Sequence, residues 1–215
     1  MRARLIGRCE SVELVFAQVL VNPGEKLSHV YFPTTSFISL VTPIGGKEIL
    51  EVALAGSEGM FGVSVALGAP FSNVRGLVQG TGTAWRIGAS SFQRELGANR
   101  ALARGVNRYI HLLMGQLALT AGCNRFHVVE QRLARWLLMT SDRAHSSSFH
   151  ITHEFLAFML GVRRVGITKA ASALQRQKLI AYSRGEVTIL DRAGLEGASC
   201  HCYRSDLDAY EQMFG

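Results

Sequence analysis

The spacing of the apolar residues changes near residue 90, and this change limits the folds that the chain can adopt. From about Val12 to Trp85, short runs of β-branched and aromatic residues alternate with glycines and other turn-forming residues, which is typical of strands. After Ser90, apolar residues recur at steps of three and four, the period of a helix. Strands first and helices afterwards predict an α+β chain with an N-terminal all-β domain.

The strand-like runs of the N-terminal half are short and numerous. They read HVYFP, SFISLVTP, EILEVALAG, GLVQG and GTAWRI. Within PIGGKE, Gly45 and Gly46 can adopt the positive φ angles of a tight hairpin turn. Many short strands joined by such turns predict a sandwich, a roll or a barrel.

The helical half begins with a long apolar stripe. It consists of Leu102, Val106, Tyr109, Leu113, Leu117 and Thr120. The stripe can pack on the β domain of its own chain or on the same helix of a second copy, and its length favours the dimer. We expect Gly122, Cys123 and Asn124 to interrupt this helix and a second helix to resume at Val129.

Composition and charge narrow the class of protein. The chain has 215 residues, 48% of them apolar and 18% charged, which is typical of globular domains and long enough for two. Its formal charge of +7 favours an anionic partner such as nucleic acid. The apolar run LVFAQVLV is shorter than the roughly 18–20 residues of a membrane span. We therefore expect a cytoplasmic protein without a membrane partner or a secretory signal.

The segment 151–190 predicts a winged helix-turn-helix. ITHEFLAFML is a short helix with Thr152 as its N-cap and Glu154 in its first turn, and Gly161 provides the sharp turn that follows. A further helix is expected from about Arg163 to Gln177, and then two strands around the turn 183–186. The preceding SDRAHSSSFH is expected to be a polar loop. Two helices joined by a tight turn, with a hairpin behind them, can place the second helix in the major groove of DNA.

Positive charge is concentrated in this segment. Between Phe155 and Gly185 there are six basic residues and no acidic one. Arginine can bind guanine through two parallel hydrogen bonds, so Arg163 and Arg164 are candidates for reading bases. Lys169 and Arg184 are expected to contact phosphates, which contributes affinity and salt dependence. For His153, at the start of the first helix, phosphate contact or solvation is expected.

These motifs resemble a known family. RLARWLL (132–138), ITHEFLAFMLGVRRVGITKAASALQRQKLI (151–180) and the following hairpin resemble the DNA-binding domain of the CRP/FNR family of bacterial transcription regulators. SFISLVTPIGGKEILEVALAGSEGMFG (36–62) resembles that family's cyclic-nucleotide-binding-type β-roll. The resemblance implies a β-roll (double-stranded β-helix or jelly-roll-like) at 1–97, a dimerisation helix at 98–122 and a winged helix-turn-helix at 123–215.

The resemblance also implies partners and site residues. The expected partners are double-stranded DNA with a near-palindromic site, a second copy of the chain, and RNA polymerase. The DNA-binding positions are Thr152, His153, Arg163, Arg164, Val165, Lys169 and Arg184. Val165 replaces an acidic residue that is common in this family, so the half-site sequence is left open. The alternative is a ligand-binding or protein-interaction module whose helix-turn-helix no longer reads DNA.

The sensor side departs from the family pattern. The candidate ligand-binding residues are Gly62, Val63 and Arg75. Val63 stands where cyclic-nucleotide-binding members have a glutamate for the ribose, and Arg75 is an uncertain counterpart of the phosphate-binding arginine. The resemblance therefore argues against cyclic AMP and leaves open another anion, a small apolar ligand, or no ligand.

No metal or catalytic site is assigned from the sequence, and whether a cysteine or histidine binds metal or haem is left open. An N-terminal iron–sulfur site needs several cysteines, and only Cys9 lies there. Cys200 and Cys202, with His201 between them, lack a matching second pair, so the four cysteines are interpreted as structural thiols and no cofactor is assigned. The chain has no nucleophile elbow, phosphate loop or H-E-x-x-H helix, and we expect no enzymatic activity.

Overall fold

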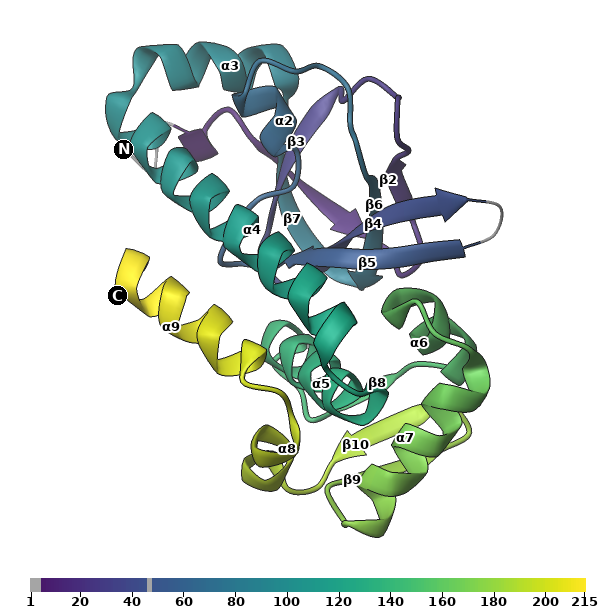
Figure 1. Ribbon diagram of the computed structural model, residues 1–215. Helices are drawn as coiled ribbons and strands as arrows, with labels where there is room; N and C mark the ends of the chain where they lie inside the picture. Colours follow the sequence, from purple (N-terminus) through teal and green to yellow (C-terminus); the bar gives the residue numbers. More distant parts are fainter. Residues whose placement is uncertain (1–4, 46–47) are drawn as a thin grey trace. The chain divides into compact units, whose positions relative to one another are not determined.

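The computed structural model describes residues 5–45 and 48–215. The predicted order, strands first and helices afterwards, is confirmed (Figure 1). The chain divides into two compact units. The first comprises Met1–Pro43 and Val52–Met114, and the second comprises Ile44–Glu51 and Gly115–Gly215.

Two sheets form the β domain. One has the order β1–β7–β3, and the other has the order β2–β6–β4–β5. The strand bounds are β1 Glu10–Leu14, β2 Val19–Val21, β3 His29–Pro33, β4 Phe37–Gly45, β5 Glu48–Ala55, β6 Arg75–Gly80 and β7 Gly82–Gly88. The pairs β1–β7, β3–β7, β2–β6 and β4–β6 are antiparallel.

The five predicted strand runs correspond to β3–β7 and are confirmed. β1 and β2 were not predicted as separate strands, because β1 exposes three of its five residues and β2 is only three residues long. Of the predicted hairpin turn, Gly45 has φ +146°, and Gly46 lies outside the described residues. β4 and β5 are hydrogen-bonded neighbours, as a hairpin requires.

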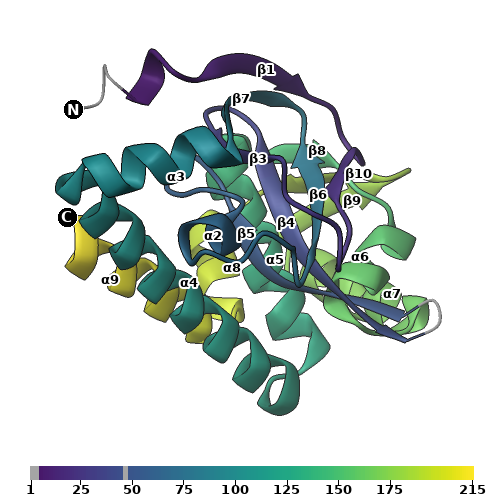
Figure 2. The ribbon, with the colours of Figure 1, turned by 90° about the horizontal axis from the view of Figure 1, so that it is seen from above.

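The inward-facing residues of the two sheets share one apolar core. Val30, Ile38 and Val78 are completely buried in it, together with Phe92 from α3. α3 (Ala89–Ala98) packs on β3 and β7 (Figure 2). A short helix, α2 (Val63–Ala66), lies between β5 and β6 in the sequence. The core closes the β domain by burying apolar surface from all these elements.

The long helix α4 runs from Arg100 to Phe126. It begins after Asn99, whose side-chain Oδ1 accepts hydrogen bonds from the backbone N–H groups of Ala101 and Leu102, both at 3.1 Å. The prediction that residues 122–124 interrupt the helix is wrong. A glycine inside a helix costs only about 1 kcal/mol, and here Cys123 is buried at 2% exposure and offsets that cost by packing.

The apolar side chains along α4 differ in how far they are buried. Val106, Tyr109 and Leu113 belong to the core of the β domain, so the alternative of packing on the chain's own β domain holds for them. Farther along, Met114 is 64% exposed and Leu117 is 38% exposed. The buried part of the stripe is therefore not available to a second copy, whereas the side that carries Met114 is.

The second unit contains the remaining helices and a three-stranded sheet of order β8–β10–β9 (Figure 1). Its elements after α4 are α5 Val129–Ala144, β8 Ser148–His150, α6 His153–Leu160, α7 Arg164–Arg176, β9 Ile180–Ser183, β10 Glu186–Ile189, α8 Arg192–Ala198 and α9 Cys202–Phe214. The helix at Val129 and the two strands around 183–186 are confirmed. β8 lies in the segment that was expected to be a loop, because it pairs with β10.

α5 is the central helix of this unit. Leu133, Leu137 and Leu138 are at most 1% exposed. α6, α7 and α8 contribute Leu156, Ile167, Leu174 and Leu195, which are also at most 2% exposed. Burial on this scale fixes α7 against α5 and gives the helix-turn-helix a rigid base. No helix among the described residues is long and apolar enough to cross a membrane.

Candidate functional site

The first helix of the motif, α6, has the capping residues that its sequence predicts. The Thr152 side chain accepts a hydrogen bond from the Phe155 backbone N–H at 3.2 Å, and Glu154 lies in the first turn. Gly161 ends the helix in the left-handed region with φ +60° and ψ +42°. Residues other than glycine rarely adopt this conformation, so Gly161 permits the sharp turn into α7.

α7 presents its basic residues to solvent and its apolar residues to the core. Arg163 occupies the N-cap position with an extended backbone, and α7 itself begins at Arg164. Ile167, Ala170, Ala171 and Leu174 are buried. Arg163, Arg164, Val165 and Lys169 are exposed. The predicted division of this helix between core and solvent is therefore confirmed.

Sequence reasoning missed two polar residues on the exposed side of α7. Thr168 and Ser172 are exposed and lie three to four residues from Arg164, Val165 and Lys169. Residues at this spacing share one helix face. The periodicity alone could have identified them, because both side chains can donate hydrogen bonds to base edges or phosphates.

His153 connects the start of α6 to the start of α7. Its Nδ1 lies 3.1 Å from Thr168 Oγ1, and Thr168 Oγ1 donates to the Arg164 carbonyl oxygen, also at 3.1 Å. Because Thr168 donates its only hydroxyl proton to the Arg164 carbonyl, His153 Nδ1 is the donor in the bond between His153 and Thr168. The ring also packs against Tyr182 with centroids 4.5 Å apart.

Burial, and secondarily the charge of Arg164, lowers the pKa of His153. The ring is therefore neutral at pH 7 and contributes no positive charge to the surface. Instead of being freely solvated, it is half-buried and positions the first turn of α7.

The tip of the β9–β10 hairpin carries a basic residue. Arg184 and Gly185 both have positive φ angles, +53° and +86°, as a two-residue hairpin turn of type I′ requires. The Arg184 side chain is exposed. This hairpin corresponds to the wing of a winged helix, and Arg184 lies in its turn.

The candidate ligand residues of the β domain lie on two elements. Gly62, with φ +104°, precedes α2, and Val63 is the first residue of that helix and packs on the apolar core. Arg75 begins β6, and its Nε donates to Asn22 Oδ1 at 3.0 Å. Val63 thus offers no polar group, and Arg75 already has a partner within the domain.

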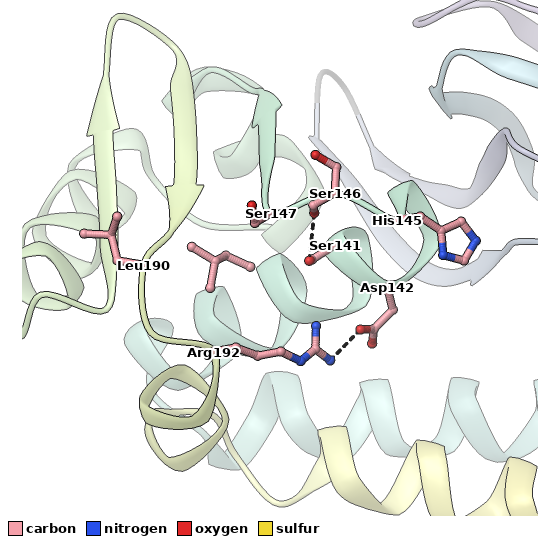
Figure 3. A pocket seen from close by; sticks show the side chains of 8 residues that line it. Ser141, Asp142, His145, Ser146, Ser147, Leu190 and Arg192 are labelled. Carbon is pink, nitrogen blue, oxygen red and sulfur yellow. Dashed lines mark hydrogen bonds and ion pairs between the residues drawn. The ribbon is translucent and has the colours of Figure 1, made fainter.

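A cavity of about 480 Å³ opens on the second unit between the end of α5 and the start of α8 (Figure 3). Its lining includes Ser141, Asp142, His145 and Arg192. Arg192 Nη2 donates to Asp142 Oδ1 at 2.6 Å. These two charges neutralise each other, so the cavity presents no free ionic group from this pair.

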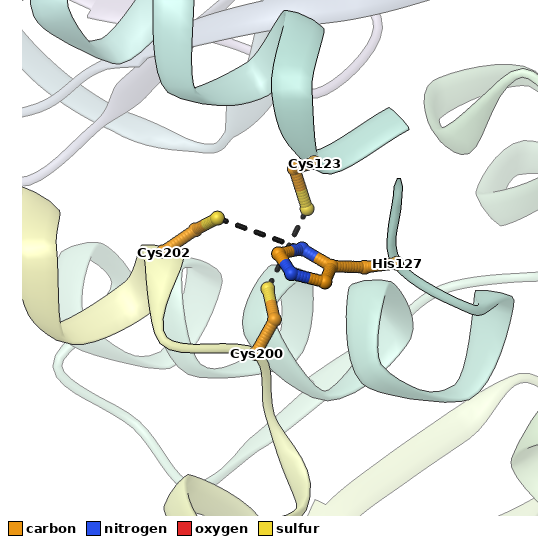
Figure 4. Close-up of side chains that lie close together, drawn as sticks. All are labelled: Cys123, His127, Cys200 and Cys202. Carbon is orange, nitrogen blue, oxygen red and sulfur yellow. Dashed lines mark hydrogen bonds between the residues drawn. The ribbon is translucent and has the colours of Figure 1, made fainter. Parts of the chain in front are cut away.

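The structure assembles one group of side chains that the sequence interpretation kept apart. Cys123, His127, Cys200 and Cys202 have their ligand atoms within 4.8 Å of one another (Figure 4). The Cys123 and Cys200 sulfur atoms lie 3.5 Å apart, and a shared proton lowers the pKa of Cys123 and raises that of Cys200. His201 lies beside this group, its ring 5.1 Å from that of His127.

Comparisons with known proteins bear on both units. Residues 131–198 match the family of Crp-like helix-turn-helix domains. No curated protein matches the sequence of the chain at a significant level.

Similar solved structures cover almost the whole chain. A transcriptional regulator of the crp/fnr family from Eubacterium rectale is 18% identical, with a TM-score of 0.72, and the match covers 91% of this chain and 92% of that one. FixK2 from Bradyrhizobium japonicum is 14% identical, with a TM-score of 0.75 and coverage of 89% and 98%. A CRP/FNR family regulator from Thermus thermophilus is 18% identical, with a TM-score of 0.73 and coverage of 88% and 98%.

At such identities the solved structures establish the fold, and the domain match identifies the helix-turn-helix. The chain therefore has the fold of the CRP/FNR family of transcriptional regulators and carries a Crp-like helix-turn-helix domain at residues 131–198.

Proposed function

We propose that the chain is a sequence-specific DNA-binding transcription regulator that acts in the cytoplasm as a homodimer on a near-palindromic site. The observation that carries this proposal is the exposed surface of α7. Arg163, Arg164 and Lys169 are exposed at its N-terminal end, above a buried apolar face. A helix held in this way can enter the major groove with its first turn directed at base edges.

The candidate residues are proposed to make different kinds of contact with DNA. Arg163 and Arg164 are proposed to bind guanine, and Val165, 58% exposed, offers an apolar contact such as the thymine methyl group. Thr152, Lys169 and Arg184 are proposed to contact phosphates. His153 is proposed to act chiefly by holding Thr168 and the first turn of α7. RNA polymerase is proposed as a further partner, and no catalytic step is part of this function.

A second copy is proposed to bind along the exposed side of α4. As the resemblance implies, the proposed domains are a β-roll at 1–97, a dimerisation helix at 98–122 and a winged helix-turn-helix at 123–215. Met114 is exposed, and Gly115 and Ala118 beside it are exposed as well and are small enough to permit close helix approach. An apolar side chain next to small residues is a suitable contact for the same helix of a second copy.

Replacing Met114 with glutamate is expected to weaken the dimer roughly 10-fold or more, because each copy would then place a carboxylate in an apolar, symmetric contact. Sedimentation velocity over a range of concentrations measures the change. Met114→Leu is the matched control and should leave the dimer intact. Identical monomer–dimer equilibria for the glutamate and leucine variants would exclude this face.

The signal at the β-roll is proposed to be something other than cyclic AMP. Val63 has no carboxylate for a ribose hydroxyl, and the Arg75 Nε proton is bound by Asn22. A small molecule of another class, acting through different affinities for two states of the dimer, remains compatible with these residues. Isothermal titration of the full chain with cyclic AMP is expected to show no heat of binding.

The proposal is tested by the salt dependence of DNA binding. Fluorescence anisotropy with a labelled random duplex is expected to show an affinity that falls steeply with salt. Lys169→Ala should weaken specific and random duplexes alike and reduce the logarithmic salt slope by about one unit. Lys26→Ala, which removes an exposed lysine from the β domain, is the matched control and should change neither. Absence of any salt-dependent binding would favour a module that no longer binds DNA.

A further inference from the structure

Three cysteines and one histidine from distant parts of the second unit converge on one point. Cys123 lies in the last turn of α4, and His127 follows the end of α4. Cys200 lies two residues before α9, and Cys202 is the first residue of α9. The three sulfur atoms and the His127 ring point toward one another (Figure 4). Cys123, Cys200 and Cys202 are 2–4% exposed.

The local backbone explains how the four side chains meet. His127 follows Cys123 by four residues, and its N–H donates to the Cys123 carbonyl at 3.1 Å, so the two share a helix face. Cys200 and Cys202 are brought close together by a turn in which the Tyr203 N–H donates to the Cys200 carbonyl at 3.1 Å. Cys123 and His127 thus supply one pair of neighbouring ligand atoms, and Cys200 and Cys202 supply the other.

Two of the distances between these atoms are close to those around a tetrahedral metal ion, and all four atoms lie within 4.8 Å of one another. Zinc binds sulfur at about 2.3 Å and nitrogen at about 2.0–2.1 Å, which places neighbouring ligand atoms of a tetrahedron roughly 3.5–3.8 Å apart. The Cys123 and Cys200 sulfur atoms are 3.5 Å apart, and Cys202 Sγ lies 3.6 Å from His127 Nδ1. Three thiols and one imidazole form a complete ligand set of the type found in structural zinc sites.

The charges around the group favour an anionic complex. Arg132 and Arg135 are 8% and 6% exposed, and both lie within electrostatic range of Cys123 and Cys200. Their Nε atoms are buried without a hydrogen-bond partner among the residues that the structure describes. Arg135 Nη2 is paired with Asp206 Oδ2 at 2.6 Å, which leaves the positive charge of Arg132 without a carboxylate partner in this group.

A dication bound by three thiolates carries one net negative charge. Arg132, Arg135 and Asp206 together carry one net positive charge, which is opposite to the net charge of the complex. A buried charge costs much less free energy when an opposite charge lies near it.

From this geometry we propose that Cys123, His127, Cys200 and Cys202 bind one tetrahedral divalent metal ion of the zinc class. All four ligands come from the protein, so the site has no open position for a substrate and its role is structural. The ion joins the last turns of α4 to the start of α9 and stabilises the second unit. The proposal is independent of the proposed DNA recognition.

Cobalt substitution of the full-length protein tests the site directly. Protein purified in thiol-containing buffer, stripped with a chelator and titrated with Co²⁺ is expected to bind one ion per chain. The bound ion should show the intense visible bands of tetrahedral Co²⁺ and a thiolate-to-cobalt charge-transfer band, and Zn²⁺ should displace it. No binding, a weak octahedral spectrum, or a disulfide between Cys123 and Cys200 that persists in the thiol-containing buffer would each overturn the proposal.

Variants assign the ligands. Replacing a residue that only supports a metal ligand typically weakens metal binding roughly 10- to 100-fold. Cys202→Ser removes a ligand itself and is expected to weaken Co²⁺ binding by more than this. Zn²⁺ should raise the midpoint of thermal unfolding of the original chain and not of this variant. Cys9→Ser is the matched control, since Cys9 lies in the β domain and its Sγ donates to the Leu5 carbonyl.

Equal Co²⁺ affinity for Cys202→Ser and Cys9→Ser would contradict the assignment. If Cys202→Ser does not fold, His127→Ala provides the second variant, and its loss of the nitrogen ligand should alter the Co²⁺ spectrum. An unchanged spectrum in His127→Ala would also contradict the assignment. The spectrum of the unsubstituted protein decides the presence of the site without any variant.

Discussion

Replacing Arg164 with alanine is expected to weaken binding to the specific DNA site by about 1–3 kcal/mol, which is roughly 5- to 150-fold. Arg164 is exposed at the first position of α7, and the bond from Thr168 to its carbonyl holds the backbone of this turn. An arginine fixed there can form two parallel hydrogen bonds to guanine, and alanine can form none. Competition titrations with specific and random duplexes measure the difference.

Two variants separate base reading from charge. Arg164→Lys keeps the positive charge and loses the planar pair of donors. Its specificity should therefore fall nearly as much as that of Arg164→Ala. Arg176→Ala removes the same charge from the exposed far end of α7, about 18 Å from Arg164. It should affect specific binding much less. If Arg164→Ala weakens specific and random DNA equally, Arg164 contacts phosphate and does not read a base.

The second large effect concerns the support of α7. Leu174→Ala is expected to lower the free energy of unfolding of the second unit by about 2–5 kcal/mol. Leu174 is completely buried on the face of α7 that packs against α5. Removing most of its side chain loses apolar burial and leaves a cavity that the surrounding helices cannot fill completely.

The measurement uses the two tryptophans of the chain. Trp136 lies buried in α5 of the second unit, and Trp85 lies in β7 of the first. In a Trp85→Phe background, the fluorescence of Trp136 reports urea unfolding of the second unit alone. Gln175→Ala, at the adjacent exposed position, is the matched control and should change stability by less than about 0.5 kcal/mol. Equal stability of the two variants would mean that α7 does not depend on this contact.

Local signals predicted the helix-turn-helix. Thr152, Gly161 and the apolar spacing of α7 each specify a short-range feature: a cap, a left-handed turn and a buried face. The turn at Arg184 and Gly185 follows from the same kind of local preference. The strand runs β3–β7 were predictable because β-branched and aromatic runs bounded by glycine favour strands in any context.

Features that depend on tertiary contacts were not predictable. β8 is a strand because β10 offers it a partner, although its sequence is polar. α4 continues through Gly122 because Cys123 packs in the interior of the second unit. The stripe on α4 has the same spacing whether it faces a β domain or a second helix, and only the fold shows that Val106, Tyr109 and Leu113 face the β domain.

The cluster of Cys123, His127, Cys200 and Cys202 also depends on tertiary contacts that the sequence does not reveal. Cys123 and Cys200 are 77 residues apart in sequence, and their sulfur atoms come within 3.5 Å only because the chain after α8 returns to the end of α4. The sequence presents a pair with one intervening residue and an isolated cysteine, neither of which is a standard zinc motif alone. The four-residue step from Cys123 to His127 was the one local signal of a shared helix face.

The central claim is that α7 reads DNA sequence, and selection from random duplex DNA tests it most directly. The purified full chain, without added effector, is used at two salt concentrations, and the retained duplexes are sequenced. Enrichment of a two-fold symmetric site at both concentrations, with altered preference at one position of each half-site for Arg164→Ala, is the predicted result. Retention that depends on salt but enriches no sequence, with or without Arg164, would contradict it.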